Sequence, residues 1–113
     1  MTVQSESSRW YDLQAFIAIV NTIGDVFTHA APYQAHIPSF SSLWGFTSAS
    51  ETVSAGALSR EQVDARIERQ VKGLLRSYDG QAHAGMFALP KHVRTALEGC
   101  NTVITDASPL SVY

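Results

Sequence analysis

Residues 30–50 have the sequence AAPYQAHIPSFSSLWGFTSAS, in which two runs suited to β-strands lie on either side of a turn. In the first run, Ala30 to Pro38, apolar and polar side chains alternate, as expected of a half-buried strand. The second run, Leu43 to Ser50, is rich in Trp, Phe and Thr, which favour strands. Residues 38–42 connect the two runs. This stretch therefore predicts an antiparallel hairpin with a five-residue loop.

Two helical patterns follow the hairpin. Ser59 begins a capping-box pattern with Gln62, ahead of an amphipathic surface helix. Another helical stretch runs from about residue 82 to residue 98, ends near Gly99, and should be kinked or restarted at Pro90. The apolar stripe expected for the first of these helices consists of Val63, Ile67, Val71 and Leu74.

The residues before the hairpin predict a polar lead and one buried helix. Residues 1–9 are Ser-rich with little to bury, so we expect a disordered lead and order from about Trp10. Between Asp12 and Phe27 the apolar residues recur at helical spacing in a wide stripe, and Asp12 suits the first turn. The resulting α-β-β-α-α order predicts an α/β fold that is too short for a complete doubly wound sheet.

Composition limits the class of protein. The 113 residues are 45% apolar and 16% charged with a net charge of -2, which fits one small domain and excludes a broadly basic nucleic-acid binder, although a local basic face stays possible. The single cysteine, Cys100, excludes an intrachain disulfide. No apolar run is long enough to span a bilayer, and the polar start does not resemble a secretory signal. We therefore expect a cytoplasmic protein with no membrane partner.

Charge is distributed unevenly along the chain. Residues 1–58 contain one basic side chain, Arg9, whereas residues 59–113 contain seven basic and six acidic ones. A nearly uncharged first half suggests that both sides of its elements are covered, by the rest of this chain or by another. This pattern predicts a partner surface in the first half of the chain.

Common catalytic and metal-binding motifs are absent from the sequence. Neither a His-x-x-x-His spacing nor a Gly-x-Ser-x-Gly turn occurs, so neither a zinc site nor an autonomous hydrolase is indicated. The seven glycines are scattered singly and form no phosphate-binding loop. The most informative stretch is the aromatic turn of residues 37–46. It can line a pocket above the sheet, or its aromatic residues Phe40, Trp44 and Phe46 can be plain core.

Several collinear segments resemble the C-terminal portion of the spermidine synthases, the polyamine aminopropyltransferases. Residues 33–40 and 44–50 resemble the family's strand ending in Pro-Ser-Phe or Pro-Thr-Tyr and its following Trp-Gly-Phe strand. Residues 76–94 resemble its Arg-Tyr-Tyr, His, Phe-Ala-Leu-Pro and Val-Arg segments, and residues 105–109 its Thr-Asp-Asp-x-Pro ending. The resemblance covers roughly residues 10–113 and implies the end of a Rossmann-like, methyltransferase-type fold, with residues 10–113 as one C-terminal subdomain.

The resemblance also implies roles for residues of the turn. Pro38, Phe40 and Trp44 would line one wall of the amine-substrate pocket. Phe40 lacks the hydroxyl of family members that have Tyr there, and Ser77 and Ala107 replace a Tyr and an Asp. The family's Gly-rich loop for decarboxylated S-adenosylmethionine, its co-substrate, and its catalytic Asp have no counterpart, so this chain alone should bind no co-substrate.

Aminopropyl transfer needs an unprotonated amine and a carboxylate placed to accept its proton. The acids in predicted helices and loops should instead be solvated. These acids are Asp12, Asp25, Glu61, Asp64, Glu68, Asp79, Glu98 and Asp106. We therefore expect a part or subunit of an aminopropyltransferase of polyamine biosynthesis, inactive alone, that forms a homo-oligomer or pairs with a separate cofactor-binding chain. The alternative is a degenerate paralogue or non-catalytic module that binds another protein through its open sheet.

Overall fold

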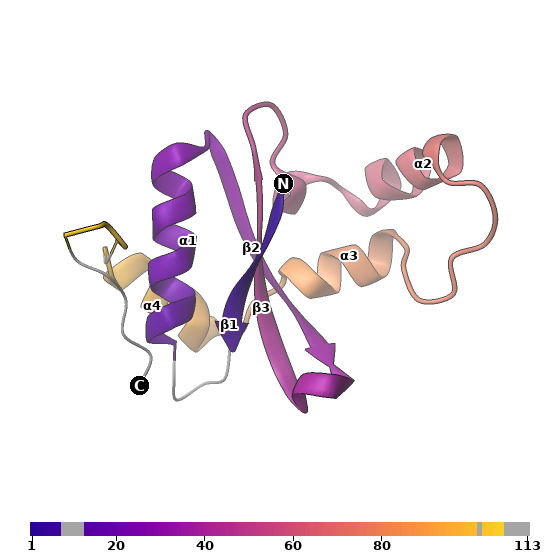
Figure 1. The fold of residues 1–113 in the computed structure, drawn as a ribbon. Coiled ribbons are helices and arrows are strands. Elements are labelled where there is room, and N and C mark those ends of the chain that lie inside the picture. The colour runs from indigo at the N-terminus through magenta and orange to yellow at the C-terminus, as the bar shows by residue number, and fades with distance from the viewer. Residues whose placement is uncertain (8–12, 102, 108–113) are drawn as a thin grey trace.

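The computed structural model describes residues 1–7, 13–101 and 103–107. Its elements are β1 (Thr2–Ser7), α1 (Gln14–Val26), β2 (His29–Ile37), β3 (Ser42–Ser50), α2 (Arg60–Gln70), α3 (Gly80–Phe87) and α4 (Lys91–Gly99), with 3-10 turns at Pro38–Phe40 and Ala55–Ala57. The strands form one sheet in the order β1-β3-β2 (Figure 1). The predicted α/β fold with a helix, an antiparallel hairpin and covering helices is confirmed.

The predicted hairpin forms between β2 and β3. Their antiparallel register runs from His29 opposite Ser50 to Ile37 opposite Ser42. The loop is one residue shorter than expected, because Ser42 already belongs to β3. Pro38 begins the 3-10 turn, and Ser41 closes it in a left-handed conformation with φ of 53°. The Ser41 N–H donates to the Pro38 carbonyl at 3.1 Å, which fixes the direction of the turn.

The expected disordered lead at residues 1–9 is wrong for Thr2–Ser7, which form β1 against β3. Ser5 is fully buried there, and its Oγ lies 2.6 Å from Thr47 Oγ1 in a buried hydrogen bond. Val3 is the one apolar residue of the six, so the segment lacks the alternation that indicates a strand. Pairing with a distant segment, rather than local propensity, orders it.

α1 covers one face of the sheet and contributes most of the core. Because β1 and β2 are both antiparallel to β3, they are parallel to each other, and α1 connects them. The helix is largely buried, as predicted, although Asp12 and Trp10 lie outside the described residues. Gly45 of β3 leaves room for the ring of Phe16, whose Cδ2 would lie 2.4 Å from an added Cβ. The main apolar cluster consists of Phe16, Val20, Leu89 and Val93.

The second half of the chain forms three short helices. The capping box at the start of α2 is confirmed, since Ser59 Oγ accepts from the Gln62 N–H at 3.1 Å and Gln62 Oε1 accepts from the Ser59 N–H at 2.8 Å. The predicted stripe does not extend to Leu74, because α2 ends at Gln70 and Leu74 is 99% exposed. Pro90 separates α3 from α4 rather than kinking one helix.

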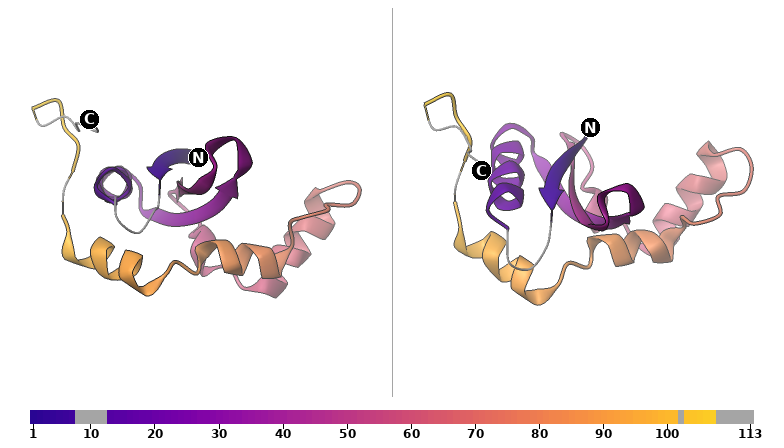
Figure 2. Two further views of the ribbon diagram at one scale, coloured as in Figure 1. Left: turned by 90° about the horizontal axis from the view of Figure 1, so that it is seen from below. Right: turned by 60° about the horizontal axis from the view of Figure 1, so that its bottom comes forward.

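These helices extend the molecule away from the sheet. α3 packs on β2, whereas α2 packs mainly against α3 (Figure 2). The radius of gyration is 14.9 Å, against about 13 Å expected for a compact domain of this length. None of the helices in the described ranges has the length and apolar character needed to traverse a bilayer.

Candidate functional site

The hairpin turn lies at the end of the sheet where β1 and β2 finish. Ligands of α/β proteins usually bind at this end. β1 and β2 run in the same direction on either side of β3. Their carboxyl ends lie at the same end of the sheet, since Ser7 pairs with Trp44 and Ile37 with Ser42. In open α/β sheets the crevice outside the carboxyl ends of parallel strands is the usual ligand site. The turn of Pro38–Phe40 follows directly at this edge.

Two of the three predicted site residues are in contact at this turn. The ring centroids of Phe40 and Trp44 lie 4.5 Å apart with their planes tilted by 44°. Pro38 begins the same turn and is exposed. Phe40 is 41% exposed, so it is not a plain core residue. Phe40 and Trp44 thus pack together beside Pro38 at this turn, and we call these three residues the turn wall.

Trp44 carries a polar atom with no partner. Its indole Nε1 is buried and has no hydrogen-bond acceptor among the described residues. A buried donor without an acceptor costs about 1–3 kcal/mol, and such groups are rare in folded proteins. An acceptor supplied from outside the described chain would remove this cost.

Glu6 is a feature of this edge that the sequence analysis did not identify. It lies in an irregularity of β1 between Gln4 and Ser7, with φ of 70°, a conformation that a non-glycine residue rarely adopts. Its carboxyl group is exposed, and its backbone carbonyl lies close to Gly45, the neighbour of Trp44. Strained residues of this kind concentrate at functional sites. The sequence alone does not mark Glu6, because residues 2–7 have no strand pattern and the feature depends on the pairing of β1 with β3.

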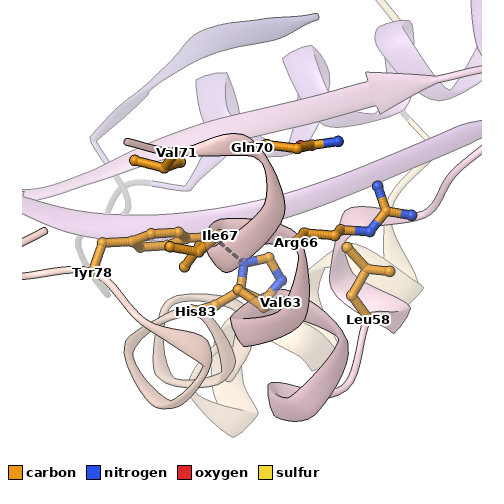
Figure 3. A pocket seen from close by; sticks show the side chains of 8 residues that line it. All are labelled: Leu58, Val63, Arg66, Ile67, Gln70, Val71, Tyr78 and His83. Carbon is orange, nitrogen blue, oxygen red and sulfur yellow. Dashed lines mark hydrogen bonds between the residues drawn. The ribbon is translucent and has the colours of Figure 1, made fainter. Parts of the chain in front are cut away.

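A second polar cluster lies between α2, α3 and the turn of Ala55–Ala57. His83 Nε2 is 2.7 Å from the Ala55 carbonyl, which can only accept, so Nε2 carries the hydrogen. In the neutral imidazole, Nδ1 then accepts from the Tyr78 hydroxyl at 2.7 Å (Figure 3). Tyr78 and His83 belong to the segments that resemble the family's Arg-Tyr-Tyr and His motifs. In the structure they form hydrogen bonds within the chain. This chain of hydrogen bonds ties the 71–79 segment to α3.

The cluster continues across the sheet through stacked rings. His83 contacts Phe87, whose ring centroid lies 5.0 Å from that of Tyr33, and Tyr33 stacks on Phe46 at 5.3 Å. Burial raises the pKa of the Tyr33 hydroxyl, partly opposed by a hydrogen bond with Thr2. Burial also raises the pKa of Tyr78, with a smaller contribution from the nearby Tyr33. Both phenols therefore stay neutral below pH 10.

Two of the acids expected to be solvated are exposed and also accept backbone hydrogen bonds. Asp64 Oδ1 accepts from the Gly80 N–H at 2.7 Å, which connects α2 to α3. Asp79 Oδ1 accepts from the Ala82 N–H at 2.8 Å and caps α3. Both contacts explain the fold and neither indicates catalysis. Asp12 lies outside the described residues.

Neither a glycine-rich phosphate-binding loop nor a cluster of metal-ligand side chains is found among the residues that the structure describes. No glycine-rich turn joins a strand to a helix in the described part of the chain. Among residues 1–7, 13–101 and 103–107, no three His, Cys, Asp or Glu side chains gather as metal ligands would. Cys100 follows α4, and its carbonyl accepts from Asn21 Nδ2 at 2.8 Å.

The chain is similar to known proteins in both sequence and fold, although no protein-family profile matches it. The polyamine aminopropyltransferase of Sulfurisphaera tokodaii is 38% identical over 110 residues, which cover 97% of this chain and 37% of that relative. Polyamine aminopropyltransferase 2 of Hyperthermus butylicus is 40% identical over 99 residues, covering 88% and 32%. The chain thus spans about a third of the length of these relatives.

Solved structures give the same result. The spermidine synthase from Thermotoga maritima matches with a TM-score of 0.67 at 25% identity, over 88% of this chain and 34% of that chain. A spermidine synthase in complex with the transition state analogue AdoDATO matches equally well, over 32% of its length. The resemblance to a portion of this family is confirmed, and the coverage is consistent with the C-terminal portion.

Proposed function

This chain is homologous to a portion of the polyamine aminopropyltransferases, and on that premise we propose that it is the amine-binding part of such an enzyme. It contributes the turn wall of Pro38, Phe40 and Trp44 to a pocket that is complete only with a cofactor-binding part. The observation that carries the proposal is the contact of Phe40 with Trp44 at the carboxyl edge of the parallel strands.

An aromatic wall suits the two states of an amine substrate. A protonated alkylamine on a ring face gains about 0.5–2 kcal/mol from the cation–π attraction. The attacking form, however, is the neutral amine, which at pH 7 is about one molecule in a few thousand. Burial against apolar rings disfavours the charged form and so lowers the pKa of the amine. The turn wall would therefore bind the charged amine, and burial of the amine once the pocket is completed by the cofactor-binding part would favour the neutral, reactive form.

The carboxylate that accepts the proton lost by the attacking amine has no counterpart in this chain, so it would belong to the complementing part. Glu6 is the exposed carboxylate described at this edge, next to the strand segment that holds Trp44. We assign it the binding of one ammonium group of a diamine. Phe40 provides no hydroxyl for hydrogen bonding, so recognition at this position would rest on ring contact alone.

The missing functions would come from a second part of the enzyme. Decarboxylated S-adenosylmethionine has no binding residues here, so the donor must be held elsewhere. β1 is an edge of the described sheet, and its free backbone groups can pair with a further strand. An added strand would place the donor site beside the turn wall. The acceptor for the Trp44 N–H can come from the same source.

The test is complementation. The full chain is mixed with the part of the Sulfurisphaera tokodaii relative that it does not match, and spermidine formation from putrescine and decarboxylated S-adenosylmethionine is measured. We expect no turnover from either part alone and measurable turnover from the mixture. The variant Phe40→Ala should reduce that turnover by at least about tenfold, roughly 1.4 kcal/mol, whereas the remote surface variant Lys91→Ala should not. Turnover by the chain alone would contradict the proposal.

A second function is favoured by the open edge of β1. A non-catalytic module that binds another protein through this edge would need neither an amine nor the turn wall. Such a module would associate with the complementing part or with itself, yet Phe40→Ala would not affect any activity. Sedimentation of the chain at micromolar concentration does not separate the two cases, because both predict association. The Phe40 variant then decides between them.

A further inference from the structure

The two faces of the hairpin present different side chains. On β3, Gly45 faces α1, because a Cβ added there would meet the ring of Phe16. Side chains alternate along a strand, so the neighbouring Trp44 and Phe46 point to the opposite face. Phe46 stacks on Tyr33 there, and α3 covers this face next to Tyr33. We call this second face the aromatic face, and it holds the Trp44 of the turn wall.

The register of the hairpin sets each β2 residue of the aromatic face opposite one of β3 (Figure 1). Tyr33 lies opposite Phe46, so two large rings meet there. One pair further along the same face, Ala35 lies opposite Trp44. The Cβ atoms of opposite residues in an antiparallel pair are about 4.5–5.5 Å apart. A side chain larger than alanine at position 35 would therefore compete with the indole of Trp44 for the same space.

The indole of Trp44 extends to the turn. Its ring centroid lies 4.5 Å from that of Phe40, within the range of favourable aromatic pairs. Trp44 is half-buried and its Nε1 is buried, so the indole lies against the protein surface instead of projecting into water. At the opposite position, β2 adds no more than the methyl group of Ala35. The contact of the two rings thus depends on a position that lies outside the turn itself.

We propose that Ala35 is a positioning residue of the amine pocket. Its small side chain lets the Trp44 indole lie against Phe40, and so it sets the shape of the turn wall. This inference rests on the proposed amine-binding function and adds to it a residue that acts through Trp44. A bulkier side chain at position 35 would push the indole away from Phe40. The amine would then meet one ring at a time instead of two packed rings.

The first part of the test measures the ring contact in the full chain alone. Proton NMR should show a nuclear Overhauser cross-peak between the rings of Phe40 and Trp44, whose centroids are 4.5 Å apart. Ala35→Leu should abolish this cross-peak and Ala35→Gly should retain it. Ala35→Val, which adds less volume and suits a strand, should weaken it. The matched control Ala65→Leu adds the same volume at an exposed position of α2 and should retain it.

The second part measures spermidine formation by the complemented chain. Ala35→Leu should raise the KM for putrescine at least about threefold, the size expected for one lost aromatic contact. The KM for decarboxylated S-adenosylmethionine should stay the same. Ala35→Gly and Ala65→Leu should change either KM less than about twofold. A variant that only lost stability would reduce the amount of active complex and leave both KM values unchanged, so this comparison separates positioning from folding.

Two outcomes would overturn the proposal. The first is a cross-peak between Phe40 and Trp44 that persists in both Ala35→Leu and Ala35→Val, or that is absent from the original chain. The second is a KM for putrescine that does not change in Ala35→Leu although Phe40→Ala raises it. If Phe40→Ala also leaves this KM unchanged, the proposed amine-binding function fails and the pocket role of Ala35 fails with it. The cross-peak separately decides whether Ala35 sets the contact of the two rings.

Discussion

The two ends of this molecule differ in how they bury apolar surface. Around α1, the fully buried Phe16 and Val93 join the sheet to α4 in one core. Around α2, one valine is buried, and the adjoining coil exposes Leu74 and Leu75. The two ends nevertheless belong to one chain with similar helix lengths. We conclude that the α1 end contributes most of the stability of the fold, whereas α2 is attached mainly to α3 and buries little apolar surface.

The comparison also separates two kinds of exposed apolar surface. The Phe40–Trp44 contact of the turn wall lies in a closed hairpin, next to the left-handed Ser41. Such a surface suits a small substrate, whose binding needs fixed geometry. The 71–79 segment contains no helix or strand and exposes Leu74 and Leu75. Tyr78 attaches it to α3 through the hydrogen bond with His83.

The largest effect should come from Phe16→Ala. Removing a fully buried ring beside Gly45 should lower the free energy of unfolding by about 3–5 kcal/mol. The matched substitution at the other end, Leu74→Ala, should change it by less than about 0.5 kcal/mol. Denaturant unfolding of both variants measures the contrast. Equal losses would contradict the division of stability between the two ends.

A glycine at the junction of α2 and α3 gives a local test. A Cβ on Gly80 would lie 2.2 Å from the Arg60 carbonyl oxygen, so Gly80→Ala must push the two helices apart. We expect a local loss of about 1–3 kcal/mol that reduces amide protection in α2. Protection of β2 and β3 should be unchanged in hydrogen exchange. Loss of protection in the sheet would mean that the two ends are one cooperative unit.

Phe40→Tyr should have a small effect on stability. Phe40 is 41% exposed, so the added hydroxyl can reach water and the free energy of unfolding should change by less than about 0.5 kcal/mol. A buried, unsatisfied hydroxyl would instead cost about 1–3 kcal/mol. Thermal unfolding of the variant distinguishes the two. A loss in the upper range would assign the turn wall to the core and remove its proposed role.

The smallest effect is expected at alkaline pH. The pKa of Tyr33 is raised above its ordinary value of 10.0 by burial, so the folded chain holds the proton more tightly than the unfolded chain does. Its contribution is therefore fully present below pH 10 and is lost as pH rises through the folded pKa. Tyr33→Phe should flatten the decline in stability above pH 10. A stability that does not fall there would show that Tyr33 is not buried enough to matter.

The sequence predicted those parts of the fold whose signals are local. Strand alternation in residues 30–50 and the Ser59–Gln62 capping box both use neighbours in the chain, and both are confirmed. β1 was missed because its strand depends on pairing with the distant β3 and on the buried Ser5–Thr47 hydrogen bond, which joins residues 42 apart in the sequence. Glu6 was missed for the same reason, since its unusual φ exists only once β1 pairs.

The end of α2 shows the opposite error. The spacing of Val71 and Leu74 continued the helical stripe, but no core lies there to cover a further turn. Gly73, with φ of 93°, also takes a left-handed conformation that a helix cannot continue through. The helical spacing of apolar residues does not show whether another part of the chain is present to cover them. The roles of Pro38, Phe40 and Trp44 in binding the amine are predictions that substrate binding tests directly.

The most direct test of the amine-binding role is the putrescine dependence of spermidine formation by the complemented complex. The comparison is between the original chain and Phe40→Ala. We predict a KM for putrescine that rises at least about tenfold in the variant, with an unchanged KM for decarboxylated S-adenosylmethionine, because the turn wall contacts the amine alone. A KM for putrescine that stays the same, or equal changes for both substrates, would contradict the assignment of the turn wall to the amine pocket.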